Sequence, residues 1–326
     1  MPYLTAHALD RANEWLVRWR LGGRLPADVD RSGLTYLTEL GDRIHPDPKT
    51  LDDLAPRPLS SSSSLWRCPS PWPGAEQNNA VWYAETVAAG GGRPEPVRPA
   101  LIVLHGWLAS RPQLIVYRRW ARRVARHGID VWLPRLPHHI ERAAPGEVSG
   151  ELCLSPRLST SIDAVRQAVA EARLLARWLR HQGAPTVGIW GMSLGGWVAA
   201  LAATLDDDWD AVALWAPVAS PVEVLFESRL VALLRAAVVD GGLSAADFAA
   251  PEIAWMTPAE RDVRVPRERV LLVAGAYDQV ILPRSVARIA RRWNVDVRWV
   301  PHGHISLMGS VAPMRDTASF LVGRLR

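Results

Sequence analysis

Hydrophobic residues gather in short runs along most of the chain, and longer stretches of mixed polarity separate these runs. The runs that predict strands lie at residues 80–87, 100–105, 128–133, 187–190, 211–215, 270–274 and 295–300. Between them, residues 113–127, 160–181 and 197–205 have the periodicity of helices. Short apolar strands that alternate with helices predict an α/β fold with a doubly wound, mostly parallel sheet.

The first residues form a separate amphipathic pattern. Within residues 4–19 the apolar side chains share one stripe, formed by Leu4, Ala8, Leu9, Ala12, Trp15, Leu16 and Trp19. Polar residues such as Asp10 and Arg18 lie elsewhere on the helix. This spacing predicts an N-terminal helix that docks onto the rest of the chain or onto a second copy. Peripheral contact with a membrane surface is the alternative, because the helix carries both Trp and Arg.

The segment after this helix has a different composition. Residues 41–73 are rich in Pro, Ser and Asp, and they include five consecutive serines, Ser60 to Ser64. Such a stretch predicts a linker or wrapping segment without regular structure. We therefore divide the chain into an N-terminal helical extension with its linker, residues 1–79, and one main domain, residues 80–326.

Composition and charge exclude several classes of protein. With 48% hydrophobic and 22% charged residues, the 326-residue chain is typical of a folded globular protein. The net charge is +5, but the arginines are spread among acidic residues, so we expect no nucleic-acid partner. Cys68 and Cys153 lie far apart, which predicts neither a disulfide scaffold nor a thiolate metal site. Without a secretory signal pattern or an apolar run of about 18 residues, we expect a cytoplasmic protein with no membrane span.

The glycine-rich turn around Ser193 is the first candidate for chemistry. Gly191-Met192-Ser193-Leu194-Gly195 follows one predicted strand and precedes a predicted helix. In a Gly-x-Ser-x-Gly turn the serine is held in a strained conformation, and the glycines avoid clashes where the chain folds back. The pattern therefore predicts a nucleophile elbow with Ser193 as the nucleophile. A plain glycine-rich turn with an exposed serine is the alternative.

An acid and two histidines follow later strands in the chain. A serine hydroxyl is a poor nucleophile at neutral pH, so it needs a base that a carboxylate holds in place. Asp278 comes directly after the apolar strand at residues 270–274, and His302 and His304 come after the strand at 295–300. The carboxyl ends of parallel strands share one edge of the sheet, which brings these groups to the side where Ser193 lies.

These motifs together resemble the α/β-hydrolase superfamily of serine hydrolases. The resemblance rests on His105-Gly106-Trp107, the turn from Gly191 to Gly195, Asp278, and Gly303-His304, and it covers the chain from about residue 80 to the end. It implies an α/β-hydrolase fold with Ser193 as nucleophile, Asp278 as orienting acid and His304 as general base. His302 is the rival base, but His304 matches the superfamily position after Gly303.

The same resemblance implies how the site stabilises an oxyanion. The backbone N–H of Leu194, next to the nucleophile, supplies one donor, and the N–H of Trp107 supplies the other. His105 then closes its loop and is not a second base. A narrower similarity to the α/β-hydrolase domain-containing protein 18 group rests on Tyr117-Arg118-Arg119 and on Gly303-His304-Ile305-Ser306.

Other residues near these motifs are candidate substrate contacts. This set contains His105, Met192, His138, His139 and His302. Adjacent histidines rarely chelate one ion well, so His138 and His139 predict a pocket-lining loop, and we expect no metal and no organic cofactor. Residues 221–258 carry apolar side chains at helical spacing where the superfamily commonly has a lid, which predicts a small helical cap. An ordinary crossover helix with a long loop is the alternative.

The activity expected from these residues is hydrolysis of a carboxylic ester by a Ser-His-Asp triad through an acyl-enzyme, as in a carboxylesterase or a lipase-like enzyme. The apolar cap favours a small hydrophobic ester as substrate. Acyl transfer and hydrolysis of a lactone, thioester or peptide use the same triad and stay open. A hydrolase-like protein that binds a ligand without turnover is the alternative from another class. The sequence does not fix the acyl and alcohol groups or the oligomeric state.

Overall fold

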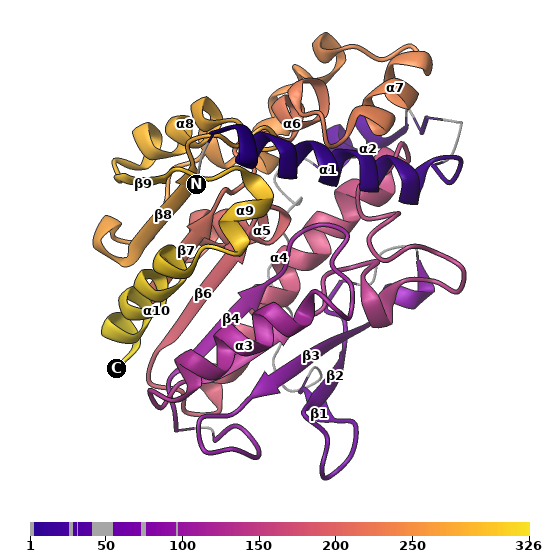
Figure 1. Cartoon of the computed structure of the whole chain (residues 1–326). Helices are drawn as coiled ribbons and strands as arrows, with labels where there is room; N and C mark the ends of the chain where they lie inside the picture. The colour runs from indigo at the N-terminus through magenta and orange to yellow at the C-terminus, as the bar shows by residue number, and fades with distance from the viewer. Residues whose placement is uncertain (1–2, 26–28, 31, 41–54, 73–75, 96) are drawn as a thin grey trace.

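A mixed, mostly parallel β-sheet runs through the middle of the protein, which a computed structural model describes over residues 3–25, 29–30, 32–40, 55–72, 76–95 and 97–326. Over these residues the sheet has nine strands in the order β1-β2-β3-β5-β4-β6-β7-β8-β9 (Figure 1). The strands are β1 (Arg57–Pro58), β2 (Leu65–Pro69), β3 (Val81–Val87), β4 (Ala100–Leu104), β5 (Asp130–Pro134), β6 (Val187–Met192), β7 (Ala211–Trp215), β8 (Val270–Gly275) and β9 (Val297–Val300). The six from β4 to β9 pair in parallel, and β1, β2 and β3 are antiparallel.

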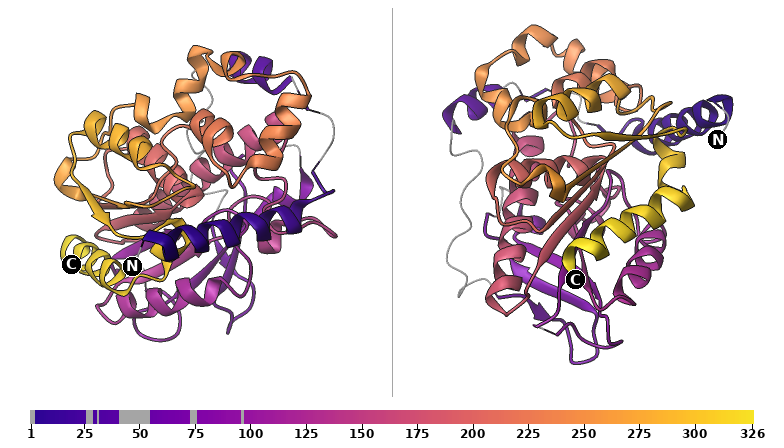
Figure 2. Two further views of the ribbon diagram at one scale, coloured as in Figure 1. Left: turned by 45° about the horizontal axis from the view of Figure 1, so that its top comes forward. Right: turned by 90° about the vertical axis from the view of Figure 1, so that its left-hand side faces the viewer.

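Helices cover both faces of this sheet, which confirms the predicted doubly wound α/β fold. The helices are α1 (Tyr3–Leu21), α2 (Ser32–Leu40), α3 (Leu114–Ala125), α4 (Leu158–His181), α5 (Leu194–Leu205), α6 (Pro221–Glu227), α7 (Ala232–Asp240), α8 (Pro283–Trp293), α9 (His304–Met308) and α10 (Val311–Leu325). Helices α3 and α10 lie on one face, and α4 and α5 lie on the other (Figures 1 and 2). Every residue of β4, β5, β6 and β7 is buried, because central parallel strands are covered on both faces.

The expected linker is wrong over part of its length, because β1 and β2 lie within it. Strand β2 pairs with β3 along all five of its residues, with Trp66 opposite Ala84. Trp66 also packs against the rings of Trp132 and Trp178, at centroid distances of 5.1 and 6.2 Å. The serine run forms the turn between β1 and β2, so the sheet begins before residue 80. Residues 41–54 of the expected linker lie outside the described residues.

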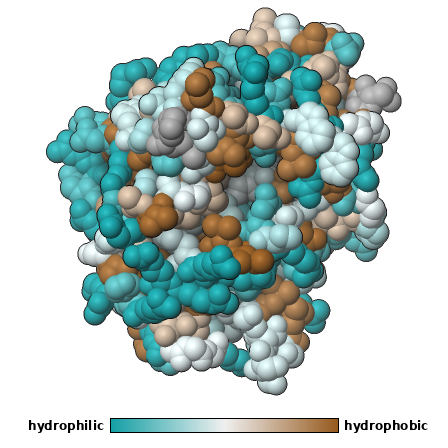
Figure 3. All heavy atoms as spheres, viewed as in Figure 1, coloured by the Kyte–Doolittle hydropathy of each residue, from teal (hydrophilic) through white to brown (hydrophobic). Residues whose placement is uncertain are grey.

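The N-terminal helix is confirmed as α1, but the side that it buries is not the expected one. Its buried residues are Ala6, Asp10, Val17 and Leu21. The predicted apolar stripe faces outward, and Leu4, Trp15 and Trp19 are 78, 67 and 71% exposed. Leu16 of α1 and Val116 of α3 are exposed as well, at 40 and 42%. Figure 3 shows hydrophobic residues, in brown, among hydrophilic ones on the face that is seen in Figure 1. The contacts of Asp10 described below explain why the helix docks in this orientation.

The segment at residues 221–258 is largely helical. It contains α6, α7 and two 3₁₀ segments, at Ala245–Phe248 and Pro251–Met256. Phe226 of α6 stacks edge-on against Phe248, with ring centroids 5.6 Å apart. In Figure 1 this segment lies at the same end of the molecule as α1 and α2. We call residues 221–258 the cap segment.

A buried ion pair fixes the loop after β5 to the long helix α4. Arg142 is completely buried, and its guanidinium donates to both carboxylate oxygens of Glu171, over 2.6 and 2.9 Å. Arg142 also donates to the carbonyl oxygens of Arg135 and Asn79. These bonds satisfy a charge that would otherwise be isolated from water.

Removal of the Glu171 carboxylate is expected to destabilise the protein strongly. Glu171→Ala leaves the Arg142 charge buried without its acid, and such a loss costs about 3–5 kcal/mol. The free energy of unfolding in urea measures this. The matched control is Glu268→Ala, because the Arg267–Glu268 pair is 60 and 58% exposed and water and salt screen such a pair, so that its loss changes the stability little. Equal effects of the two substitutions would contradict the prediction.

Candidate active site

Ser193 lies at a sharp turn between β6 and α5. Its backbone has φ 56° and ψ −116°, a conformation that side-chain-bearing residues rarely adopt. The Ser193 N–H donates to the carbonyl oxygen of Trp215 on β7, over 2.9 Å. A Cβ on Gly191 would lie 2.1 Å from the Gly195 carbonyl oxygen, and one on Gly195 would lie 2.4 Å from that of Leu104. Only glycine fits at both positions, so the elbow depends on the two glycines.

Asp278 and His304 form a buried hydrogen-bonded pair. His304 Nδ1 donates to Asp278 Oδ2 over 2.7 Å. The other carboxylate oxygen, Oδ1, accepts from the backbone N–H groups of Val280 and Ile281, each over 2.8 Å. With Nδ1 engaged in this way, His304 retains Nε2 as its proton acceptor. This is the arrangement that a general base with an orienting carboxylate requires.

One cavity of about 320 Å³ contains both Ser193 and His304 in its wall. The segment at residues 106–109, the start of α3 and the start of α9 supply other parts of the wall. Met192 lines it from the end of β6, and Leu230 lines it from the cap segment. Helix α1 closes one side with Asn13, Leu16, Val17 and Arg20. The N-terminal extension is therefore part of this cavity.

The loop after β4 passes directly beside the elbow. A Cβ on Gly106 would lie 3.8 Å from the Ser193 Cβ. In this loop the Gly106 N–H donates to the Tyr117 hydroxyl, and the Leu108 N–H donates to His139 Nε2. The N–H between them, that of Trp107, makes no hydrogen bond to any other described residue. Within the same described ranges, the N–H of Leu194 is also without a protein acceptor.

Three of the predicted substrate contacts are buried and hold loops together. His105 Nε2 accepts from the Leu136 N–H, and its Nδ1 donates to the Gly106 carbonyl oxygen. His139 accepts from Leu108 and donates from Nδ1 to the Pro137 carbonyl oxygen, over 2.7 Å. Burial lowers the pKa of His139 to about 4 and that of His138 to about 3, and it also lowers the pKa of His105. None of the three lines the cavity, and we assign these neutral rings to the loops.

Of the other two predicted substrate contacts, Met192 and His302, one lines the cavity and the other does not. Met192 lines the cavity, whereas His302 is not among the residues of its wall. His302 lies in the turn between β9 and α9, where its carbonyl oxygen accepts from the Tyr277 N–H. A Cβ on Gly275 would lie 2.4 Å from that carbonyl oxygen. The backbone of His302 therefore shapes the turn that presents His304.

Sequence reasoning missed Asp10, which contacts both sides of the His304–Asp278 pair. This carboxylate on α1 is 3% exposed. It accepts from the backbone N–H groups of Gln279, His304 and Ile305, over 3.2, 3.0 and 3.0 Å. A single aspartate on the polar side of an amphipathic helix carries no sequence signal for such a role.

The charge around His304 favours its protonated form. Burial by itself lowers the pKa of His304, but the negative charges of Asp278 and Asp10 outweigh burial and raise the pKa above its ordinary value. Among the described residues no cluster of three or more His, Cys, Asp or Glu side chains could hold a metal ion. The described helices also include none that is long and apolar enough to cross a membrane.

Known proteins share this fold and parts of this sequence. The model of the family named alpha/beta hydrolase domain containing 18 matches residues 116–220. Two uncharacterised proteins of Mycobacterium tuberculosis, Rv2627c of strain H37Rv and MT2702 of strain CDC 1551, are 30% identical over 222 residues. These residues are 67% of this chain and 52% of the relatives, so the chain spans about half of their length.

Solved structures of low sequence identity have the same fold. An acetyl xylan esterase from Paenibacillus sp. R4 superposes with a TM-score of 0.55 at 13% identity, over 91% of this chain and 96% of that one. A cold-adapted esterase from an Arctic intertidal metagenomic library gives 0.51 at 15% identity, over 84 and 98%. A puromycin-hydrolysing peptidase of M. tuberculosis gives 0.53 at 15% identity, over 83 and 39%. The expected α/β-hydrolase fold is confirmed, and so is the similarity to the domain-containing protein 18 group.

The strain at Ser193 predicts an unusual order of stabilities. Ser193→Gly should be more stable than Ser193→Ala by about 1–2 kcal/mol, because only glycine adopts this conformation without strain. Urea unfolding of the two variants measures the difference. Ser319 is the control, since it is an exposed residue inside α10, where glycine should be less stable than alanine by about 1 kcal/mol. If alanine were more stable than glycine at both positions, the prediction of strain at Ser193 would be wrong.

Proposed function

Because the chain has the α/β-hydrolase fold, we propose that it is a serine hydrolase that cleaves carboxylic esters with Ser193, His304 and Asp278. The observation that carries the proposal is the 2.7 Å bond from His304 Nδ1 to Asp278 Oδ2, with His304 and Ser193 in the wall of one cavity. The strained turn at Ser193 and the superfamily's chain order of serine, acid and histidine support it as well.

In the proposed reaction, His304 moves the proton between Ser193, the leaving alcohol and water. Ser193 Oγ attacks the ester carbonyl carbon while His304 Nε2 takes the hydroxyl proton, and the Asp278 carboxylate stabilises the imidazolium that forms. The C–O bond to the alcohol then breaks, and His304 returns the proton to the leaving oxygen. Water attacks the acyl-enzyme with His304 again as base, which releases the acid and restores the Ser193 hydroxyl.

Two backbone amides are proposed to stabilise the tetrahedral intermediate. Leu194 follows Ser193 in the chain, and Trp107 follows Gly106, which lies beside Ser193. The N–H groups of Trp107 and Leu194 donate to no other described residue, as an oxyanion hole requires. Gly106 and Leu108, which precede and follow Trp107, have their N–H groups engaged. The loop thus leaves the Trp107 N–H for the substrate.

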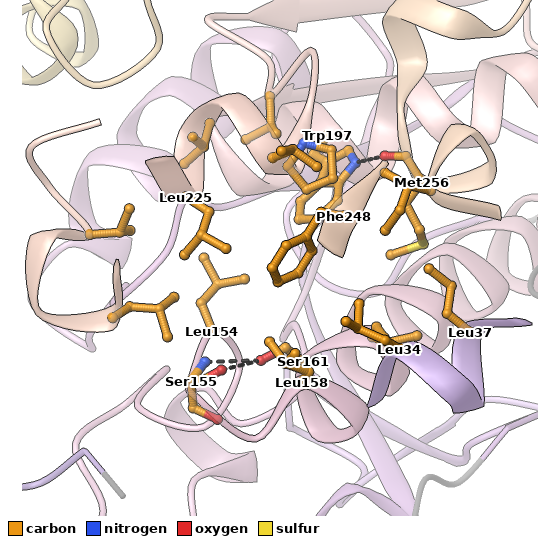
Figure 4. Close-up of a pocket in the computed structure, with 18 residues that line it drawn as sticks. Leu34, Leu37, Leu154, Ser155, Leu158, Ser161, Trp197, Leu225, Phe248 and Met256 are labelled. Carbon is orange, nitrogen blue, oxygen red and sulfur yellow. Dashed lines mark hydrogen bonds between the residues drawn. The ribbon is translucent and has the colours of Figure 1, made fainter. Parts of the chain in front are cut away.

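A second, apolar cavity supports a hydrophobic acyl group in the substrate. It measures about 120 Å³ and lies between α2, α4, α5 and the cap segment (Figure 4). Leu158, Leu225 and Phe248 are in its wall. Its few polar groups bond to one another: the Ser155 N–H donates to Ser161 Oγ, and Trp197 Nε1 donates to the Met256 carbonyl oxygen. An apolar cavity of this kind does not hold water well and accepts an apolar ligand.

The two cavities are neighbours in the structure. Trp107 lines the cavity that contains Ser193, and it also packs against the cluster of Leu158, Leu225 and Phe248. Leu230 lines the first cavity, and the next residue, Val231, lines the second. We therefore place the acyl chain of the ester in the apolar cavity, with its carbonyl group at Ser193.

Labelling with a fluorophosphonate probe tests the nucleophile and its base. The wild-type protein should react at Ser193, and Ser193→Ala should not react. His304→Ala should lower kcat on a p-nitrophenyl ester by about 10⁴-fold or more, since the general base is lost. His302→Ala should keep most of the activity.

Folded wild-type protein that stays unlabelled would contradict the enzymatic proposal and favour ligand binding without turnover. Loss of activity in His302→Ala with retention in His304→Ala would overturn the assignment of the base.

A series of p-nitrophenyl esters tests the apolar cavity. From acetate towards longer acyl chains, kcat/KM should rise up to the length that fills the cavity, by roughly fourfold for each buried CH₂. Leu225→Trp fills the cavity and should shift the optimum to shorter chains. Val239→Trp is the control, because Val239 is an exposed residue of α7 in the same cap segment. A chain-length profile that Leu225→Trp leaves unchanged would exclude this cavity as the acyl site.

A further inference from the structure

Asp10 contacts the backbone at the two places from which the acid and the base of the site project. The His304 and Ile305 N–H groups that it binds belong to the first two residues of α9. The Gln279 N–H follows directly after Asp278. A single carboxylate from α1 therefore connects the turn that carries the acid to the turn that carries the base.

Asp10 also accepts hydrogen bonds from backbone N–H groups that have no acceptor among the described residues of the main domain. The first N–H groups of a helix have no acceptor within the helix, and buried N–H groups without a partner are costly. At α9 these include the N–H groups of His304 and Ile305, which Asp10 accepts across 294 and 295 positions of sequence. Hydrogen bonds to a charged acceptor are stronger than those between neutral groups, so Asp10 holds this part of the backbone firmly.

Gly303 leaves the space that Asp10 occupies. A Cβ at residue 303 would lie 2.7 Å from Asp10 Oδ2 and 2.9 Å from its Oδ1 and Cγ. A side chain at residue 303 would therefore displace the Asp10 carboxylate. The Gly303-His304 pair and Asp10 fit each other, although Asp10 and Gly303 are 293 positions apart in the sequence.

We propose that Asp10 is a positioning residue for the reaction, which holds His304 and Asp278 in register from the N-terminal helix. This inference rests on the proposed function. Asp10 acts through the backbone N–H groups and does not touch the substrate. Helix α1 thus contributes to the site in two ways, by lining the cavity with Leu16 and Val17 and by holding the base through Asp10.

The charges around His304 give this role a measurable signature. Asp278 faces His304 from the turn after β8, and Asp10 faces it from α1. Around Asp10 itself, His7, Arg11 and Glu14 of α1 and Arg229 of the cap segment line one small pocket. Since Asp10 raises the pKa of His304, removal of its charge lowers that pKa. A base of lower pKa stays neutral to lower pH, so the acidic limb of kcat/KM moves to lower pH.

Two substitutions at Asp10 test the proposal in the full chain. Asp10→Ala removes all three bonds, and it should lower kcat on a p-nitrophenyl ester by about 10- to 100-fold with a smaller change in KM, because the base is misplaced. Asp10→Asn keeps the shape of the side chain and removes its charge, but its amide nitrogen cannot accept, so it also loses at least one of the three bonds. It should move the acidic limb of kcat/KM down by roughly half a unit to one pH unit.

The matched control is Glu14→Gln, one helical turn along α1. Among the described residues, the Glu14 carboxylate forms an ion pair with Arg18 and with no other side chain. This substitution should leave kcat and the pH profile unchanged. If Asp10→Ala does not fold, the dependence of kcat/KM on pH in Asp10→Asn tests the proposal. Folded Asp10 variants with kcat within about twofold of wild type and an unmoved acidic limb would overturn the proposal.

Titration of the His304 imidazole by NMR separates this inference from the proposed function, because it requires no turnover. An unchanged His304 pKa in Asp10→Asn would overturn the assignment to Asp10. Wild-type protein that a fluorophosphonate does not label would instead overturn the proposed function.

Discussion

The register of the parallel strands decides where Ser193, Asp278 and His304 of the candidate site lie. Strand β8 pairs with β9 so that Gly275 is opposite Val300, and the two strands end together. Asp278 and His304 follow these ends by three and four residues, which lets their side chains meet over 2.7 Å. Strand β6 ends at Met192, opposite Trp215, so the elbow emerges at the same edge of the sheet. A parallel sheet thus brings together residues that are far apart in sequence.

The elbow shows how the sheet supports a strained residue. The Ser193 conformation costs of the order of 1–3 kcal/mol and persists only where neighbours fix it. Here the Ser193 N–H is bonded to β7, its carbonyl oxygen accepts from Trp197 in α5, and Gly195 presses against β4. Every residue of β4 and β7 is buried, and so is nearly every residue of α5. The strain is therefore located where the surrounding core leaves no alternative conformation.

Sequence alone predicted the parts of the structure that depend on local patterns. The apolar runs of β4 to β8 were predictable because burial on both faces selects continuous hydrophobic segments, and the helices α3, α4 and α5 were predictable from their periodicity. Strand β2 was not, since its Leu65-Trp66-Arg67-Cys68-Pro69 is short and follows a serine run. The Asp278–His304 bond could be anticipated from motifs that end strands. The Asp10 contacts could not, because they join positions 294 residues apart without any pattern that connects them.

The orientation of α1 is decided by the surface on which it docks. Its outward stripe carries Leu4, Trp15 and Trp19, the residues that the apolar pattern alone would place inside. The docking surface, however, presents N–H groups of α9 and of Gln279 that require an acceptor, and Asp10 is the α1 residue that supplies it. Val17 and Leu21 lie on the same side and pack against Leu108. A hydrophobic pattern can therefore identify a helix correctly and still misplace its buried face, where the receiving surface is polar at one point and apolar beside it.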